Sequence, residues 1–254
     1  SLEETDARQA AATRTIGALD GVPIAMKDCV GFVKDAPRSF GSRLAVGTVI
    51  DFDDEVVARY KRAGLIPIGT TNVPEFSSSV TTESLLHGPC RNPWDLSRSV
   101  GGSSGGAAAA VAYGAVPIAY GNDAAGSIRV PSSCCGVFGL RPSRGRVPTG
   151  PVYGEFWHGL MVHHVITRSV RDSALVLDVS EGIDDGPLYG VPDKQRPFLD
   201  ECTRAPGKLN IAVSDGSELG HEIHADCLAA LKETVALLEE LGHNVEWLSP
   251  DYQS

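Results

Sequence analysis

Two glycine-rich turns in this sequence each present a serine hydroxyl, which acts as a nucleophile when a base takes its proton. Ser103 lies in the Gly/Ser cluster of residues 101–106, and Ser127 lies in a second Gly-Ser turn further along the chain. The alanine-rich residues 105–113 are predicted to form a short helix, and residues 115–120 a buried strand. Because a helix followed at once by a strand folds back on itself, we expect Ser103 and Ser127 to reach one site.

Glycines also mark the ends of these predicted elements. Gly114 suits the left-handed residue that follows the end of a helix. The pair Gly121-Asn122 is a turn signal, so the strand is predicted to end at Tyr120.

The Gly-Gly-Ser-Ser-Gly-Gly segment also has the composition of a flexible linker. Its neighbours argue against that interpretation, because a linker is not normally bounded by a strand-like apolar run and a second Gly-Ser turn. Glycine-rich turns beside ordered elements can instead aim backbone N–H groups at a phosphate or an oxyanion. No lysine follows the glycines, so the phosphate-binding P-loop pattern fails.

Lys27 is a candidate base for the two serines. It closes the apolar residues 22–26, which are predicted to form a strand. A lysine in this position is often a surface residue whose stem covers apolar atoms. If Lys27 is instead buried, desolvation lowers its pKa and the neutral amine can accept a proton. The segment is faintly similar to the lysine strand of protein kinases, but the glycine-rich loop and the Asp-Phe-Gly motif are missing.

Taken together, these segments resemble the sequence signature of the amidase signature family. The resemblance covers nearly all of this chain and about half of the family's domain. The motifs that carry it are GVPIAMKD (residues 21–28), GTTNVPEF (69–76), RNPWD (91–95), GGSSGG (101–106), GNDAAGSIRVP (121–131) and CGVFGLRP (135–142).

The resemblance implies a Ser-cisSer-Lys triad that cleaves amide bonds. It makes Ser127 the nucleophile, Ser103 the bridging serine and Lys27 the base, and it implies that the Gly102–Ser103 peptide bond is cis. An amide carbonyl would acylate Ser127, an amine protonated through Ser103 and Lys27 would depart, and water would hydrolyse the acyl-enzyme. The resemblance requires no metal and no organic cofactor.

The resemblance also places an oxyanion hole in the turn before the nucleophile. Its donors would be the backbone N–H groups of Ala124, Ala125, Gly126 and Ser127. Many relatives have glycines where this chain has Ala124 and Ala125. The branch of the family that hydrolyses the 6-aminohexanoate cyclic dimer shares the alanines, so the implied substrate is a linear or cyclic amide.

Two other interpretations of the same residues are open. Residues 102–106 fit the nucleophile elbow of α/β-hydrolase esterases, with Ser104 as nucleophile and His221 or His243 as base. The polar residues 91–98 before the elbow are a poor match to the strand that this motif requires. The other alternative is a non-catalytic module, either anion-binding or an amidotransferase-type partner subunit, in which the glycine turns hold a ligand.

The composition of the chain limits the kinds of partner that we expect it to bind. The chain has 254 residues, of which 42% are hydrophobic, and a net charge of −10, which argues against nucleic acid or an anionic membrane as a partner. It has no apolar run of spanning length and no signal-peptide pattern, so the cytoplasm is the expected location. The six cysteines have no zinc-binding spacing. The expected partners are a small-molecule amide and a second copy of the chain.

Helices and strands alternate along the chain. The predicted elements are a helix capped by Asp53 or Asp54 and running to Lys61, a strand at 65–68, a helix opened by Ser169 and running to about 180, a loop at 182–206, a strand at 209–213, a helix at 226–241 and a strand at 244–248. This alternation predicts an α/β fold with a central mixed β-sheet flanked by helices on both faces. We expect one amidase signature domain over residues 1–254, lacking the N-terminal helices and C-terminal part of the full-length family. Residues 1–15 are predicted to be the end of a helix that begins before residue 1.

Two further groups of residues carry expectations. Tyr153, Phe156 and Trp157 are predicted to line an apolar substrate pocket or to belong to the core. Cys134 and Cys135 are expected to be small buried side chains beside a tight turn.

Overall fold

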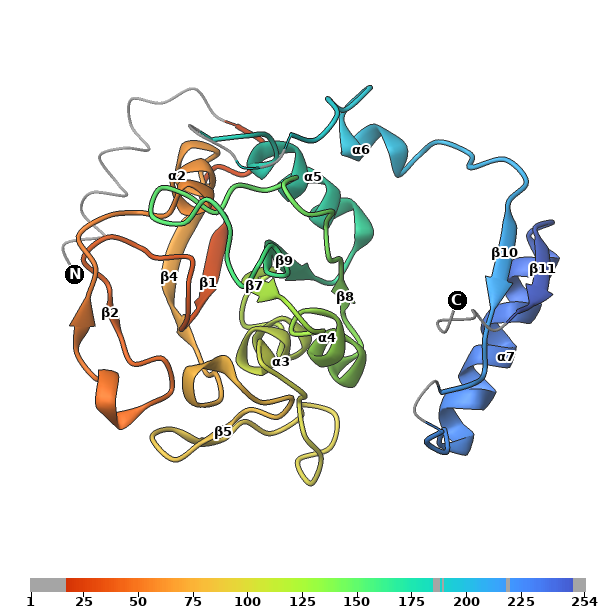
Figure 1. The fold of residues 1–254 in the computed structure, drawn as a ribbon, viewed down its shortest axis with the longest axis horizontal. Coiled ribbons are helices and arrows are strands. Elements are labelled where there is room, and N and C mark those ends of the chain that lie inside the picture. Colours follow the sequence, from red (N-terminus) through yellow and green to blue (C-terminus); the bar gives the residue numbers. More distant parts are fainter. Residues whose placement is uncertain (1–16, 185–187, 189, 218–219, 249–254) are drawn as a thin grey trace. The chain divides into compact units, whose positions relative to one another are not determined.

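The computed structural model describes residues 17–184, 188, 190–217 and 220–248 (Figure 1). The chain divides into two compact units, with the boundary between Cys202 and Thr203. The first unit carries the central sheet and every residue of the predicted triad. The helix predicted at residues 1–15 lies outside the described residues, and the extent of a single domain over 1–254 stays a prediction.

A five-stranded mixed sheet forms the centre of the first unit, with the strand order β4-β1-β7-β9-β8. β1 pairs in parallel with β4 and β7, whereas β9 pairs antiparallel with β7 and β8. The strands are β1 (Pro23–Lys27), β4 (Ile66–Thr71), β7 (Ile118–Asp123), β8 (Phe138–Gly139) and β9 (Val162–Thr167). Because β1 and β7 are parallel neighbours, their last residues, Lys27 and Asp123, come to the same edge of the sheet.

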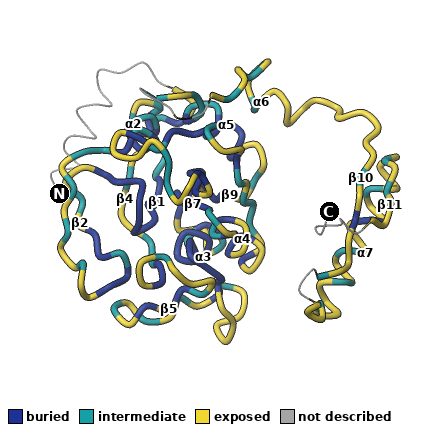
Figure 2. Tube along the Cα trace, in the orientation of Figure 1, coloured by how far each residue is buried: buried dark blue, intermediate teal, exposed yellow. Residues whose placement is uncertain are grey.

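Helices cover both faces of this sheet, as predicted. α2 (Glu55–Arg62) and α5 (Val170–Ser180) belong to the apolar cluster that contains Ile24 and Met26 of β1. α3 (Gly105–Tyr113) and α4 (Arg129–Cys135) belong to the other cluster, which contains Ala25. Successive residues of β1 therefore bury their side chains on opposite faces. Figure 2 shows the buried strands between these helices.

Short elements fill the connections of the first unit. They are β2 (Pro37–Arg38) with β3 (Thr48–Val49), β5 (Glu83–Ser84) with β6 (Gly88–Pro89), the 3-10 helices η1 (Arg43–Ala45) and η2 (Glu75–Ser77), and α6 (Phe198–Glu201). The single turn of α6 lies in the segment predicted as loop, so that prediction is wrong for these four residues.

The second unit is a strand-helix-strand segment. It consists of β10 (Asn210–Val213), α7 (Ala225–Glu240) and β11 (Asn244–Trp247). The two strands pair in parallel, and Val213 and Val235 are its buried apolar residues among those described. The strand, helix and strand predicted for this part of the chain are confirmed.

Local signals in the sequence identify several element ends correctly. α3 ends at Tyr113, and Gly114 follows in the left-handed conformation with a φ of 85°. At the start of α5, the Ser169 hydroxyl accepts the Asp172 N–H over 3.1 Å. Both ends have the residue types that favour them, because glycine tolerates positive φ and serine accepts a free N–H of the first turn.

The turn predicted at Gly121-Asn122 is wrong, because β7 continues through both residues to Asp123. β9 supplies the reason: it pairs with β7 along its whole length, from Ile118 opposite Thr167 to Asp123 opposite Val162. The strand also begins at Ile118 rather than at Ala115. Pairing with a strand that is distant in sequence overrides the local turn signal.

The helix expected after Asp53 or Asp54, α2, is present and has Asp54 at its N-cap, but the side-chain capping bond is absent. The Asp54 Oδ2 instead accepts the N–H groups of Gly31 and Phe32 over 2.7 and 2.8 Å. The carboxylate therefore fixes the loop that follows β1.

Among the described residues, no helix combines the length and the apolar character that a membrane span requires.

Candidate active site

Lys27 ends β1 with its side chain completely buried. Its Nζ lies 2.8 Å from Ser103 Oγ and 2.7 Å from Asn122 Oδ1. Burial lowers the pKa of Lys27 to about 8, although Cys29 and Asp123 nearby favour its charged form. The interpretation of Lys27 as a surface lysine is therefore wrong.

The turn that carries Ser103 is packed rather than flexible. The Gly102–Ser103 peptide bond is cis, as the family resemblance implies, and Ser103 is buried. A Cβ on Gly102 would lie 2.8 Å from the Ser79 carbonyl oxygen, and one on Gly105 would lie 2.2 Å from Thr82 Oγ1. The glycines are needed because other chain segments approach this closely. This packing excludes the flexible-linker interpretation.

A backbone hydrogen bond joins the two Gly/Ser turns. The N–H of Ser104 donates to the carbonyl oxygen of Ser127 over 3.1 Å. Ser127 is half-buried at the exit of β7, whereas Ser103 is buried beside Lys27. The fold therefore brings together the two turns that the sequence predicts to meet.

Asp123 organises the turn that contains Ser127. Its buried carboxylate accepts the N–H groups of Gly126, Ile128 and Arg129 over 2.7, 3.1 and 3.3 Å. The Arg129 guanidinium adds two bonds of 3.0 Å to the same carboxylate. Burial alone would raise the pKa of Asp123, but the hydrogen bonds from Arg129 and the backbone outweigh it and hold this pKa below its usual value.

The backbone N–H groups of this turn divide into two sets. The N–H of Gly126 is occupied by Asp123 Oδ1. The N–H groups of Ala124, Ala125 and Ser127 have no hydrogen-bond partner within the described part of the chain. Of the four expected oxyanion donors, only the Gly126 N–H is therefore engaged by another group within the described part of the chain.

Comparison with known protein families tests the family resemblance of this chain. The model of the Amidase family matches residues 2–254. The chain belongs to the amidase signature family.

The chain is similar to relatives about twice its length. It is 44% identical over 236 residues to the putative amidase AmiB2 of Mycobacterium tuberculosis, covering 91% of this chain and 48% of that protein. The solved structure of a 6-aminohexanoate cyclic dimer hydrolase with its substrate matches with a TM-score of 0.90 and 38% identity, covering 98% of this chain and 52% of that one. The peptide amidase of Stenotrophomonas maltophilia matches with a TM-score of 0.82 and 26% identity, covering 98% and 52%. The chain thus spans about half the length of the curated relatives it matches.

The nucleophile elbow that would use Ser104 has little support in the structure of this chain. Ser104 is completely buried, and its hydroxyl donates to the Asn122 carbonyl oxygen over 3.4 Å. Before the turn, residues 91–99 contain an isolated bridge between Arg91 and Ser99 and no strand. The elbow requires an exposed serine after a strand, and neither condition is met.

Sequence reasoning missed a buried polar cluster behind Lys27. Asn122 on β7 lies directly opposite His163 on β9, and the Tyr120 hydroxyl lies 2.5 Å from His163 Nδ1. Burial, together with the nearby charge of Lys27, lowers the pKa of His163 to about 4. A histidine and an asparagine in two otherwise apolar strands are the signal that could have revealed this cluster.

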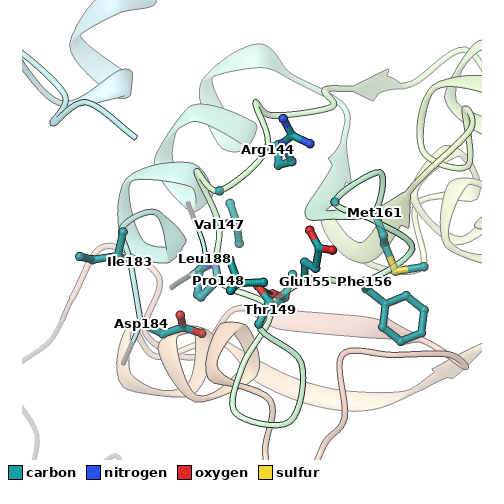
Figure 3. A pocket seen from close by; sticks show the side chains of 13 residues that line it. Arg144, Val147, Pro148, Thr149, Glu155, Phe156, Met161, Ile183, Asp184 and Leu188 are labelled. Atoms are coloured by element: carbon teal, nitrogen blue, oxygen red, sulfur yellow. Dashed lines mark hydrogen bonds between the residues drawn. The ribbon is translucent and has the colours of Figure 1, made fainter. Parts of the chain in front are cut away.

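A separate pocket, shown in Figure 3, is lined by residues of the segment 144–161 and by Ile183, Asp184 and Leu188. Phe156 and Met161 form part of its wall, and both belong to the apolar cluster that also contains Ala124. Charged side chains, among them Arg144 and Asp184, line other parts of it. No residue of the predicted triad lines this pocket.

The three aromatic residues predicted as pocket or core differ from one another. Phe156 lines the pocket. The Tyr153 ring packs edge-on against the Phe156 ring, with centroids 4.7 Å apart. Trp157 is exposed and does not line the pocket.

The expectation for the adjacent cysteines is correct for one residue only. Cys135 is buried, whereas Cys134 is exposed. Among the described residues, no group of three or more His, Cys, Asp or Glu side chains could hold a metal ion.

Proposed function

We propose that this chain carries the catalytic site of a serine amidase, with Ser127 as nucleophile, Ser103 as bridging serine and Lys27 as base. The observation that supports this proposal most strongly is the 2.8 Å contact between Lys27 Nζ and Ser103 Oγ, two side chains that are both withdrawn from solvent. A serine hydroxyl is a weak nucleophile until a base removes its proton, and this contact supplies one.

The first half of the reaction acylates Ser127. Its oxygen attacks the amide carbonyl carbon while its proton passes to Ser103 Oγ and the Ser103 proton passes to Lys27 Nζ. The resulting oxyanion accepts the free N–H groups of Ala124, Ala125 and Ser127. One such donor typically contributes roughly 100- to 1,000-fold in rate. The C–N bond then breaks as the amine takes a proton back through Ser103 from Lys27.

The second half uses the same residues in the same order. Water attacks the ester of Ser127, and its proton passes through Ser103 to Lys27. The ester bond breaks, Ser127 recovers a proton, and the carboxylic acid product departs. A Lys27 pKa of about 8 suits both halves, because the amine can accept and return a proton near neutral pH.

The proposed substrate is a small-molecule amide. The cyclic dimer hydrolase with a TM-score of 0.90 is named for the 6-aminohexanoate cyclic dimer. That dimer and its linear counterpart are therefore the first amides to assay.

A fluorophosphonate probe tests the proposal without knowledge of the substrate, because it modifies activated serines. Mass spectrometry of the labelled protein should place the adduct on Ser127, and Ser127→Ala should prevent labelling while the circular dichroism spectrum stays unchanged. Ser104→Ala is the matched control and should still be labelled at Ser127. An adduct on Ser104 would favour the esterase alternative, and labelling of neither serine would favour a non-catalytic partner subunit.

A further inference from the structure

We propose that Asn122 is a positioning residue that directs the lone pair of Lys27 toward Ser103. This inference rests on the proposed function and adds to its triad a residue that positions the base. It concerns an amide that touches the base and forms none of the bonds that change in the reaction.

The argument begins with the two contacts of the Lys27 amine. Its Nζ lies 2.7 Å from Asn122 Oδ1 and 2.8 Å from Ser103 Oγ, in a buried environment. An amide oxygen only accepts hydrogen bonds, whereas a serine hydroxyl can donate or accept. Lys27 must therefore give an N–H to Asn122. In the neutral amine this leaves the lone pair free to accept the proton of Ser103.

The fold holds Asn122 in place from several sides. It lies opposite His163 across the β7 and β9 pair, and the Tyr120 and His163 rings stack with centroids 5.8 Å apart. The loop after β1 covers Tyr120 so closely that a Cβ on Gly31 would lie 2.3 Å from its ring. Asn122 itself is 2% exposed, so its carboxamide is surrounded by protein atoms.

Asn122 is a buried polar residue, so its side chain needs partners inside the fold. It is 2% exposed, and its side chain interacts with the Tyr120 hydroxyl as well as with Lys27. Buried polar groups are generally hydrogen-bonded in folded proteins. The 2.7 Å contact of Oδ1 with Lys27 Nζ is the interaction that ties Asn122 to the candidate base.

The charges around Lys27 explain why an uncharged acceptor fits this site. Asp123 and Cys29 favour the charged amine, and the neighbouring His163 is neutral because its pKa is lowered to about 4. Arg38 contacts the backbone of Lys27, donating to its carbonyl oxygen over 3.1 Å. A carboxylate in place of Asn122 would stabilise the ammonium form, whereas an amide orients the amine without doing so.

The experiment measures the second-order rate of Ser127 labelling by the fluorophosphonate between pH 6 and 10. It compares the natural protein with Asn122→Asp, which keeps an acceptor oxygen, and Asn122→Leu, which removes it. The control is Asn92→Asp, the same substitution at a buried asparagine whose amide bonds the carbonyl oxygens of Ser99 and Cys134.

The inference predicts a different result for each variant. Asn122→Asp should move the midpoint of the pH profile upward by one unit or more, which lowers the rate at pH 7 about tenfold, and should recover most of the rate at pH 10. The labelling rate of Asn122→Leu should be about tenfold or more below that of the natural protein at every pH. Asn92→Asp should keep the natural midpoint of the pH profile.

Two results would overturn the inference while leaving the proposed function intact. One is a natural profile in both Asn122 variants, and the other is an equal loss in both at every pH with no recovery of Asn122→Asp. If Asn122→Leu does not fold, the midpoint and recovery of Asn122→Asp decide the question. Failure of the natural protein to label Ser127 would instead contradict the proposed function itself.

Discussion

The N–H of Ser104 donates a 3.1 Å hydrogen bond to the carbonyl oxygen of Ser127, and this bond ties the turn before α3 to the turn after β7. In the proposed mechanism, the turn before α3 carries the bridging serine Ser103, and the turn after β7 carries the nucleophile Ser127. Their relative position therefore depends on how closely the start of α3 packs against its surroundings. Substitutions that move this helix start are expected to change the reactivity of Ser127 without touching it.

The first prediction concerns Gly106 in the first turn of α3. A Cβ there would lie 2.4 Å from the backbone nitrogen of Asn72 and 2.5 Å from its carbonyl oxygen. Gly106→Ala is therefore expected to lower the free energy of unfolding by roughly 1–3 kcal/mol and to slow the labelling of Ser127. Urea denaturation and the labelling rate measure the two effects.

The control for this prediction is Gly69→Ala on β4, where a Cβ would contact nothing within 4 Å. This variant should keep its free energy of unfolding within about 0.5 kcal/mol and label normally. Equal behaviour of the two alanine variants would show that the start of α3 is not closely packed.

The second prediction concerns Asp123→Asn. The variant keeps the size of the side chain but loses the negative charge that holds the Gly126 N–H and Arg129. The oxyanion turn should loosen, and the labelling rate of Ser127 should fall by roughly 100-fold, the scale of one oxyanion donor. A rate within threefold of the natural protein would contradict the role given to this carboxylate.

The same residue gives a pH dependence of stability. The pKa of Asp123 is lowered in the folded protein, so the stabilisation is present above the unfolded pKa of about 3.9 and is lost as the pH falls through the folded value. The difference in unfolding free energy between the natural protein and Asp123→Asn should therefore shrink below about pH 4. A difference that grows as the pH falls would contradict this assignment.

The contrast between local and distant interactions explains which features could be predicted from the sequence. The β1 strand with Lys27 at its end and the α3 helix with Gly114 after it are set by residues adjacent in the chain. β7 continues past Tyr120 because β9 pairs with it, and the sequence near Gly121 contains no sign of that partner. The pairing of Asn122 with His163 has the same origin, so the cluster behind Lys27 became visible only in the fold.

The third prediction concerns His164, which is buried with its Nε2 2.7 Å from Ser173 Oγ. Burial lowers its pKa to about 3, below the usual value of 6.5. Between pH 6.5 and about 3, His164 is protonated in the unfolded chain but not in the folded protein. Each unit by which the pH falls in this range therefore lowers the free energy of unfolding by roughly 1.4 kcal/mol. His164→Asn should lose this contribution and show a shallower slope, measured by urea denaturation between pH 6 and 4. A slope identical to that of the natural protein would mean that His164 is protonated when folded.

The central claim, that Lys27 is the base for Ser127, is tested most directly by the pH dependence of Ser127 labelling in Lys27 variants. The natural protein should react faster as the pH rises through about 8, where the Lys27 amine becomes neutral. The labelling rate of Lys27→Arg should be at least about 100-fold lower than that of the natural protein across pH 6 to 10, because a guanidinium keeps its proton in a protein. Lys27→Ala should lower the rate by a similar factor. If Lys27→Arg instead labels Ser127 at a rate close to that of the natural protein, with the same pH profile, Lys27 is not the base.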